Sequence, residues 1–196
     1  MYLNRYTSAI MENGKITTKE RLREVADENY GYITIADIEQ LGVPTVEVRK
    51  LASRGKLEHV RRGVYKFPDL RPTERDDFAA ALVNVGEDAY LVRDAVLAVH
   101  NLALRVPTKI RVGTTRRVRH KIPTFITVEQ RAEQEKDLET FEGLRTTKVA
   151  KAILDCRGIV MNERLFQALD EATARGLVTR KEGVVVRRAL RHKVKK

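Results

Sequence analysis

Residues 31–67, GYITIADIEQLGVPTVEVRKLASRGKLEHVRRGVYKF, decide the fold of the amino-terminal part of this chain. Thr34 precedes a helical apolar repeat and Asp37 follows three residues later, a capping-box pattern with Asp in place of Glu. Gly42 is expected to end that helix, because glycine adopts the left-handed backbone of a tight turn at little steric cost. Pro44 suits the first turn of a second helix. The stretch therefore predicts two helices joined by a tight turn.

The second helix, expected over about residues 44–54, is followed by a basic hairpin. Val48 begins the inward stripe of this helix, and later apolar residues continue it at helical spacing. Two runs rich in strand formers, residues 57–60 and 64–67, flank the sequence Arg-Arg-Gly at 61–63. Two strands and a basic tip form a wing.

A further helix should precede these elements. Thr17 and Glu20 form a capping box, and the helix is expected to continue through Asn29 with Leu22 facing inward. Helices, turn and wing together are typical of a winged helix-turn-helix, which places one helix in a DNA major groove and a wing on phosphates. The sequence therefore predicts binding of double-stranded DNA.

The charge of this region supports that interpretation. Residues 43–66 contain seven Lys or Arg residues and only two acidic residues, Glu47 and Glu58. A solvated surface explains charge by itself, but charge on a winged helix favours DNA. Glu47 is evidence against DNA binding, because a carboxylate repels phosphates unless it accepts a hydrogen bond from a cytosine amino group or pairs with a neighbouring Arg. The candidate DNA-binding residues are Thr45, Glu47, Arg49, Lys50, Arg54, Arg61, Arg62 and Lys66.

The whole chain is basic, and the excess lies at its carboxyl end. Its 196 residues carry a formal net charge of +11, which favours a polyanion or an acidic protein over a neutral small substrate. Prolines at both ends of residues 68–72 mark a boundary between domains 1–70 and 71–196. Residues 146–196 hold 13 Lys/Arg against 5 Asp/Glu. The candidate partner-binding residues are Arg175, Arg180, Lys181, Arg187, Arg188 and Arg191.

The second domain is predicted to mix helix and strand, which makes the chain α+β overall. Thr73 with Asp76 should cap a helix that ends at Gly86, and residues 109–113 and 124–128 have the pattern of strands.

From residue 146 the chain is expected to be helical. Thr147 is the expected cap of a helix over 148–157, and Asn162 of one over 163–175 closed by Gly176. A last helix is expected near residues 184–192.

Opposite charges gather in two nearby segments of this domain. Residues 105–121 contain seven basic residues and no acid, and they include TTRRVRHK at 114–121. Residues 129–142 contain six acids and two basic residues. Two interpretations stay open here, a basic hairpin folded against the acidic segment, or a binding surface.

Patterns of catalytic and metal chemistry are missing. No Asp or Glu is followed two residues later by Lys, so the metal signature of restriction-type nucleases is absent, as are a Gly-Ser nucleotidyltransferase turn and phosphate-binding loops. The four histidines, at 59, 100, 120 and 192, lack metal-ligand spacing, and Cys156 has the surroundings of a core residue. We expect no enzyme activity, metal or small-molecule cofactor. No apolar run reaches membrane-spanning length, so we expect a cytoplasmic protein with no membrane partner.

With these residues in place, the chain resembles the AbiEi family of antitoxins of type IV toxin–antitoxin systems. The resemblance runs from about Ile16 to Leu190. It is most specific at 41–43 (LGV), 54–57 (RGKL) and 62–65 (RGVY), and in the second domain at 95–102 (AVLAVHNL) and 143–156 (GLRTTKVAKAILDC). The chain departs from the family at Val46 and Glu47, where Ser or Thr is usual, and its C-terminal tail is unusually basic.

The resemblance implies an amino-terminal winged helix that represses its own operon by binding promoter DNA. It also implies an α/β domain that counteracts a nucleotidyltransferase-like toxin. Two alternatives remain open from the residues themselves. One is a stand-alone winged-helix transcriptional regulator with a ligand-sensing or dimerisation domain, and the other is an enzyme that acts on nucleotides or on the toxin.

Overall fold

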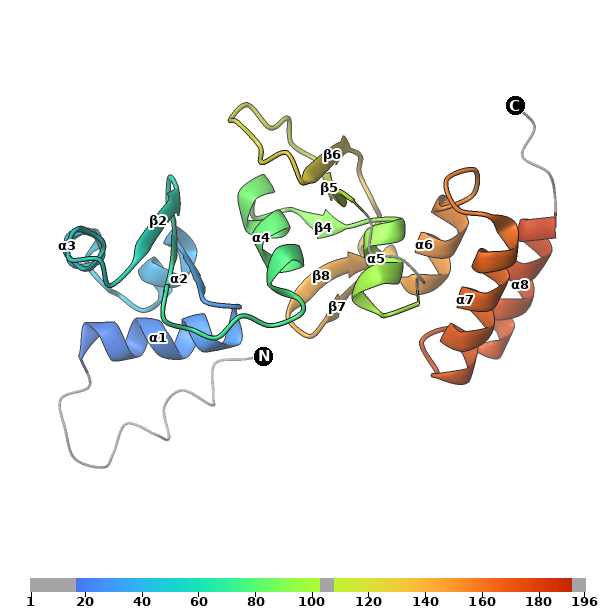
Figure 1. Cartoon of the computed structure of the whole chain (residues 1–196), viewed down its shortest axis with the longest axis horizontal. Helices are drawn as coiled ribbons and strands as arrows, with labels where there is room; N and C mark the ends of the chain where they lie inside the picture. The colour runs from blue at the N-terminus through green and yellow to red at the C-terminus, as the bar shows by residue number, and fades with distance from the viewer. Residues whose placement is uncertain (1–16, 103–107, 192–196) are drawn as a thin grey trace. The chain divides into compact units, whose positions relative to one another are not determined.

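The computed structural model describes residues 17–102 and 108–191, so Ile16, Arg105 and His192 lie outside the described residues. The chain divides into two compact units, Met1–Leu70 (unit 1) and Arg71–Lys196 (unit 2). Each unit combines helices with its own β-sheet, of three strands in unit 1 and five in unit 2 (Figure 1). The predicted α+β class is confirmed.

Unit 1 is a winged helix-turn-helix. Its elements in order are α1 (Thr18–Glu28), β1 (Tyr32–Thr34), α2 (Ile35–Gln40), α3 (Thr45–Ser53), β2 (Glu58–Arg61) and β3 (Val64–Lys66). The sheet has the order β1-β3-β2 with both pairs antiparallel. The wing was predicted as two strands. The third strand, β1, was missed because three residues are too few to show an alternating pattern.

The helix starts follow the predicted capping chemistry. The Glu20 amide donates to Thr17 Oγ1 at 3.3 Å while Glu20 Oε2 accepts from the Thr17 amide at 2.7 Å. Thr34 and Asp37 repeat the arrangement, with the Thr34 amide donating to Asp37 Oδ2 at 2.8 Å. Gly42 has φ +62°, as the turn between α2 and α3 requires.

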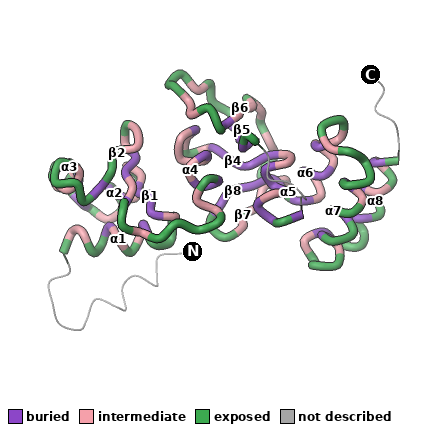
Figure 2. The backbone as a smooth tube through the Cα atoms, in the orientation of Figure 1, coloured by how far each residue is buried: buried purple, intermediate pink, exposed green. Residues whose placement is uncertain are grey.

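The core of unit 1 draws residues from all three helices and the sheet. Leu22, Ile33, Val48 and Phe67 are completely buried, and the remaining buried members of this cluster are Ala26, Ile38, Val43, Leu57 and Tyr65. Only one side of each helix therefore faces the core, as the pink and green stretches of the tube in Figure 2 illustrate. The outer side of α3 stays available to a partner.

Unit 2 packs helices against a mixed sheet. Its elements are α4 (Asp76–Val85), β4 (Tyr90–Leu91), α5 (Asp94–Val99), β5 (Ile110–Thr114), β6 (Ile126–Gln130), the 3-10 helix η1 (Glu135–Asp137), β7 (Leu138–Phe141), β8 (Leu144–Thr147), α6 (Val149–Asp155), α7 (Asn162–Ala174) and α8 (Arg180–Arg191). The sheet order is β6-β5-β4-β8-β7, parallel for β5/β6 and β4/β8 and antiparallel elsewhere.

A close approach at Gly113 holds the middle of this sheet together. A Cβ at Gly113 would lie 2.5 Å from Tyr90 Cε2, because the Tyr90 ring covers that position on the neighbouring strand. The Tyr90 hydroxyl donates to the carbonyl of Arg131 at 2.7 Å, which fixes the ring. Glycine is therefore needed at position 113 for packing.

Several local predictions in unit 2 are wrong. Strands β5 and β6 run parallel, so the interpretation of residues 114–121 as a basic hairpin, one of the two left open, is wrong; residues 115–121 begin a loop that crosses from one end of the sheet to the other. Thr146 and Thr147 are buried in β8, so Thr147 does not cap α6, and Asn162 lies in the first turn of α7 without a capping bond. The segment around Thr147 forms a strand because it pairs with β7, although its local sequence favours the start of a helix.

The start of the last helix was also misplaced. Helix α8 begins at Arg180, ahead of the expected start, because Thr179 and Glu182 form a capping box. Its buried residues are Gly183, Val186 and Leu190. Across residues 17–102 and 108–191, no helix has the length and apolar character needed to cross a bilayer.

Candidate nucleic-acid interface

The candidate groove-reading residues lie on α3 and its carboxyl end. Arg49 and Lys50 are exposed in the middle of the helix, and Arg54 is exposed at its C-cap. Thr45 and Glu47 are half-buried in its first turn. Within the described chain, the guanidinium groups of Arg49 and Arg54 are engaged in no ion pair, so both are available to phosphates or base edges.

Glu47 is paired within its own helix. Lys50 Nζ lies 3.1 Å from Glu47 Oε1, one helical turn away, and their side chains are 55% and 45% exposed. The neighbouring cation that the carboxylate needs is thus a lysine rather than an arginine. An exposed pair of this kind contributes roughly 0–1 kcal/mol, so it can open to let Lys50 contact DNA.

The wing presents Arg62 at its tip. Arg62 is exposed in the turn between β2 and β3, whereas Arg61 is half-buried at the end of β2, where the register of the strand pair shifts. Lys66 lies over the Tyr32 ring, with Nζ 4.8 Å from the ring centroid, so part of its side chain packs on the sheet. Of the three predicted wing residues, Arg62 is the most accessible.

One exposed residue of α3 was not predicted to be in the interface. Val46 is 57% exposed although it is apolar. A valine on the groove-facing surface of a recognition helix can contact a thymine methyl group. Its place two residues before buried Val48, outside the inward stripe, is the sequence signal that identifies it.

Contacts beneath the wing fix its position. Arg23 of α1 pairs with Asp69 at 2.6 Å and stacks over the Phe67 ring at 5.5 Å from its centroid. Arg21 donates to the carbonyl of Leu41, just before the turn that leads to α3. Helix α1 therefore braces both the end of the wing and the turn between the other helices.

The six candidate partner-binding residues separate into two groups. Arg175 donates to the carbonyl of His100 at 2.7 Å and pairs with Glu171. Arg187 pairs with Asp170 and lies over Phe166. The other four are exposed on α8, namely Arg180, Lys181, Arg188 and Arg191. Two of the six are thus used inside unit 2, and four form a surface.

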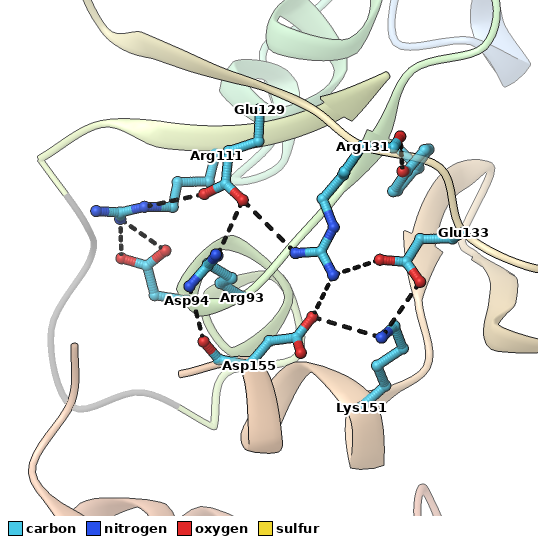
Figure 3. Close-up of polar contacts among 9 residues, drawn as sticks. Arg93, Asp94, Arg111, Glu129, Arg131, Glu133, Lys151 and Asp155 are labelled. Carbon is cyan, nitrogen blue, oxygen red and sulfur yellow. Dashed lines mark hydrogen bonds and ion pairs between the residues drawn. The ribbon is translucent and has the colours of Figure 1, made fainter. Parts of the chain in front are cut away.

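Two acids of the acidic segment of unit 2, Glu129 and Glu133, belong to an internal charge network (Figure 3). Arg131 lies at its centre, 2.7 Å from Asp155 and in contact with Glu133, while Arg111 reaches Asp94 at 2.7 Å. The eight labelled members are Arg93, Asp94, Arg111, Glu129, Arg131, Glu133, Lys151 and Asp155, four cations and four carboxylates. Because their formal charges cancel, the network braces the sheet against α5 and α6 and offers no excess charge to a ligand.

Two ionisable side chains are buried in the core of unit 2. Burial raises the pKa of the Cys156 thiol to about 12, with nearby Asp94 adding to the effect. His100 is 2% exposed, packs on Phe141 with ring centroids 4.0 Å apart, and finds no hydrogen-bond partner for either ring nitrogen among residues 17–102 and 108–191. Burial, together with the nearby cations Arg175 and Arg75, lowers the pKa of His100 to about 4. Both belong to the core.

Metal-binding geometry is absent from the parts of the chain that the structure covers. In residues 17–102 and 108–191, no three His, Cys, Asp or Glu side chains come together as potential metal ligands. The candidate interface of unit 1 is the exposed cationic surface that Arg49, Arg54 and Arg62 form on α3 and at the wing tip.

Comparison with known proteins agrees with this geometry. Residues 20–68, which span α1 to the end of the wing, match the family described as transcriptional regulator, AbiEi antitoxin. No curated protein matches the chain. The match covers the helices and strands that carry the cationic surface. The amino-terminal unit of the chain therefore matches the AbiEi family of antitoxin transcriptional regulators, the family that the sequence resembles.

Proposed function

We propose that this protein is the antitoxin of a type IV toxin–antitoxin system that represses its own operon and counteracts a nucleotidyltransferase-like toxin. In this proposal unit 1 binds promoter DNA, unit 2 neutralises the toxin, and the protein acts in the cytoplasm without catalysis or cofactor. The observation that carries it is the group of exposed cations Arg49, Arg54 and Arg62, on α3 and at the wing tip, which form no ion pair within the described residues and lie in the segment that matches the family.

DNA binding by unit 1 uses two kinds of contact. Arg49 lies in the middle of α3, the position from which a side chain reaches base edges in the major groove. Arg62 lies at the tip of the wing, from which it reaches phosphates. Loss of Arg49 should therefore change sequence preference, and loss of Arg62 should weaken all duplexes equally.

A fluorescence anisotropy titration of the full chain with the DNA upstream of its own gene tests this half. We expect Arg49→Ala to weaken the free energy of binding to the operator by about 1–3 kcal/mol and to change binding to a scrambled duplex little. Arg62→Ala should lower the slope of log K against log salt by about one unit on both duplexes. Arg164→Ala, which removes an exposed cation from α7, is the matched control. Binding that is indifferent to both variants contradicts the proposed interface.

Toxin binding is proposed for the outer face of α8. Val184 and Val185 are 69% and 66% exposed there, with Lys181 and Arg188 one turn before and after. An apolar centre with a charged rim is the usual composition of a protein interface. The positive rim favours an acidic surface on the toxin.

Co-expression with the product of the adjacent gene tests the second half. Wild-type protein should restore growth in cells that express a nucleotidyltransferase-like neighbour. The double substitution Lys181→Glu with Arg188→Glu should abolish the rescue and leave operator binding intact. Lys136→Glu with Arg164→Glu, equal in charge change and exposed elsewhere in unit 2, should keep it. Specific operator binding without any rescue by the wild type favours the stand-alone regulator instead.

A further inference from the structure

The loop between β5 and β6 carries the densest exposed positive charge in the described part of unit 2. Residues 115–121, TRRVRHK, contain four cations and no acid, and all four cations are exposed. They are Arg116, Arg117, Arg119 and Lys121. In Figure 1 the loop projects beyond the edge of the sheet that β5 and β6 form, and Figure 2 shows most of it as exposed.

This loop is held at both ends. At its start, Asp88 Oδ2 accepts from the Thr114 hydroxyl and from the Thr115 amide, each at 2.9 Å. Near its end, the His120 ring nitrogen Nε2 lies 2.7 Å from the carbonyl of Asn84 at the end of α4. The cations between these anchors are therefore presented by a fixed backbone, which lowers the ordering cost of binding a ligand.

The cations of the loop are not neutralised by the acidic segment that follows them. Glu129 and Glu133 pair with members of the charge network, and Glu135 pairs with Arg145. Within residues 17–102 and 108–191, no carboxylate forms an ion pair with any of the four loop cations. Within the described residues, the acidic segment therefore does not neutralise the basic loop, which keeps a formal charge of +4.

The composition of the loop favours a phosphodiester backbone over a protein partner. Val118 is its one aliphatic residue and is half-buried, so the loop lacks the exposed apolar centre from which protein interfaces gain most of their energy. The outer face of α8, with two exposed valines, is different in this respect. Closely spaced arginines without apolar neighbours are suited to phosphate oxygens, which they bind through paired N–H donors.

We infer that residues 115–121 form a second phosphate-binding surface, which holds the backbone of duplex DNA without regard to sequence. This inference adds a second DNA contact to the proposed function, and it rests on that function only for the choice of the operator as a probe. In one chain that carries two DNA-contacting surfaces, the second contact adds affinity without adding specificity.

Anisotropy titrations of the full chain over a range of salt concentrations test the inference. The loop variant is Arg116→Ala with Arg117→Ala and Arg119→Ala. The control removes three exposed cations elsewhere in unit 2, by Lys136→Ala, Lys148→Ala and Arg164→Ala. Fluorescent duplexes of operator and scrambled sequence are the probes, and an RNA hairpin of similar length is a third.

The loop variant should lower the salt slope by about two to three units on both duplexes, while the control changes it by less than about half a unit. Circular dichroism verifies that each variant is folded. The pair Arg117→Gln with Lys121→Gln is a milder second variant, with an expected loss of about one to two units.

Equal slopes for the loop variants and the control on duplex DNA overturn the inference. If Arg62→Ala and Arg49→Ala still weaken operator binding in that case, the proposed function stands and the loop inference alone fails. If neither wild type nor any variant binds the operator, the proposed function fails as well. A slope change confined to the RNA hairpin also overturns the inference as stated, because it assigns the surface to RNA.

Discussion

Acidification should destabilise unit 2 through His100. The imidazole is buried against Phe141, no described residue forms a hydrogen bond with either ring nitrogen, and two arginines lie near enough to oppose a positive charge. The folded protein therefore keeps His100 neutral down to a pKa of about 4, against the ordinary value of 6.5. Below pH 6.5 the unfolded chain binds a proton that the folded chain excludes, so stability is complete above that pH and is lost as the pH falls toward 4.

The magnitude follows from the two pKa values. Between about pH 7 and about pH 4.5, the linkage relation gives a loss of roughly 2 kcal/mol from this one group. Carboxylates that titrate in the same range add their own dependence, which a variant without the imidazole isolates. His100→Leu removes the titrating ring and retains an apolar side chain of similar size.

Urea unfolding followed by far-ultraviolet circular dichroism at the two pH values gives the comparison. Between these two pH values, the free energy of unfolding of the wild type should fall by roughly 2 kcal/mol more than that of His100→Leu. If both proteins lose the same free energy within about 0.5 kcal/mol, well inside that expected difference, then His100 is not held neutral by burial and the reasoning is refuted.

Three further outcomes are expected in unit 2. Arg131→Ala removes the central cation of the charge network, so that half-buried Glu133 and Asp155 keep Lys151 as their ion-pair partner, and it should cost about 2–3 kcal/mol in urea unfolding. Arg145→Ala, whose partner is exposed, should cost under about 1 kcal/mol. Gly113→Ala should lower the free energy of unfolding by about 2–3 kcal/mol, since the new Cβ meets the fixed Tyr90 ring, and an unchanged thermal midpoint would contradict the close packing. Cys156 should resist a thiol reagent in the native protein and react on unfolding; rapid native reaction would show that it is accessible.

Unit 1 was largely predictable because its signals are local. The capping boxes at Thr17 and Thr34, and the turn at Gly42, each depend on residues within four positions of one another. The exposed positions of Arg49 and Arg54 follow from helical periodicity in the same way. The pairing of Glu47 with Lys50 rather than with an arginine depends on side-chain conformations, which a pattern does not specify.

Unit 2 was less predictable because its sheet is assembled from distant segments. Strand β4 has two residues, and its partners β5 and β8 come from far along the chain in opposite orientations. The segment around Thr147 has the local appearance of a helix start and becomes a strand because β7 pairs with it. The balanced charge network likewise joins residues that no spacing in the sequence connects.

The double role of Thr34 constrains how this protein can diversify. Thr34 is the last residue of β1 and also the N-cap of α2, so no spacer separates the sheet from the helix pair. One inserted residue there would rotate the following helix by about 100° and turn Ile38 toward water. The length of this junction is therefore fixed, whereas the outward side chains of α3 can be exchanged without disturbing the scaffold.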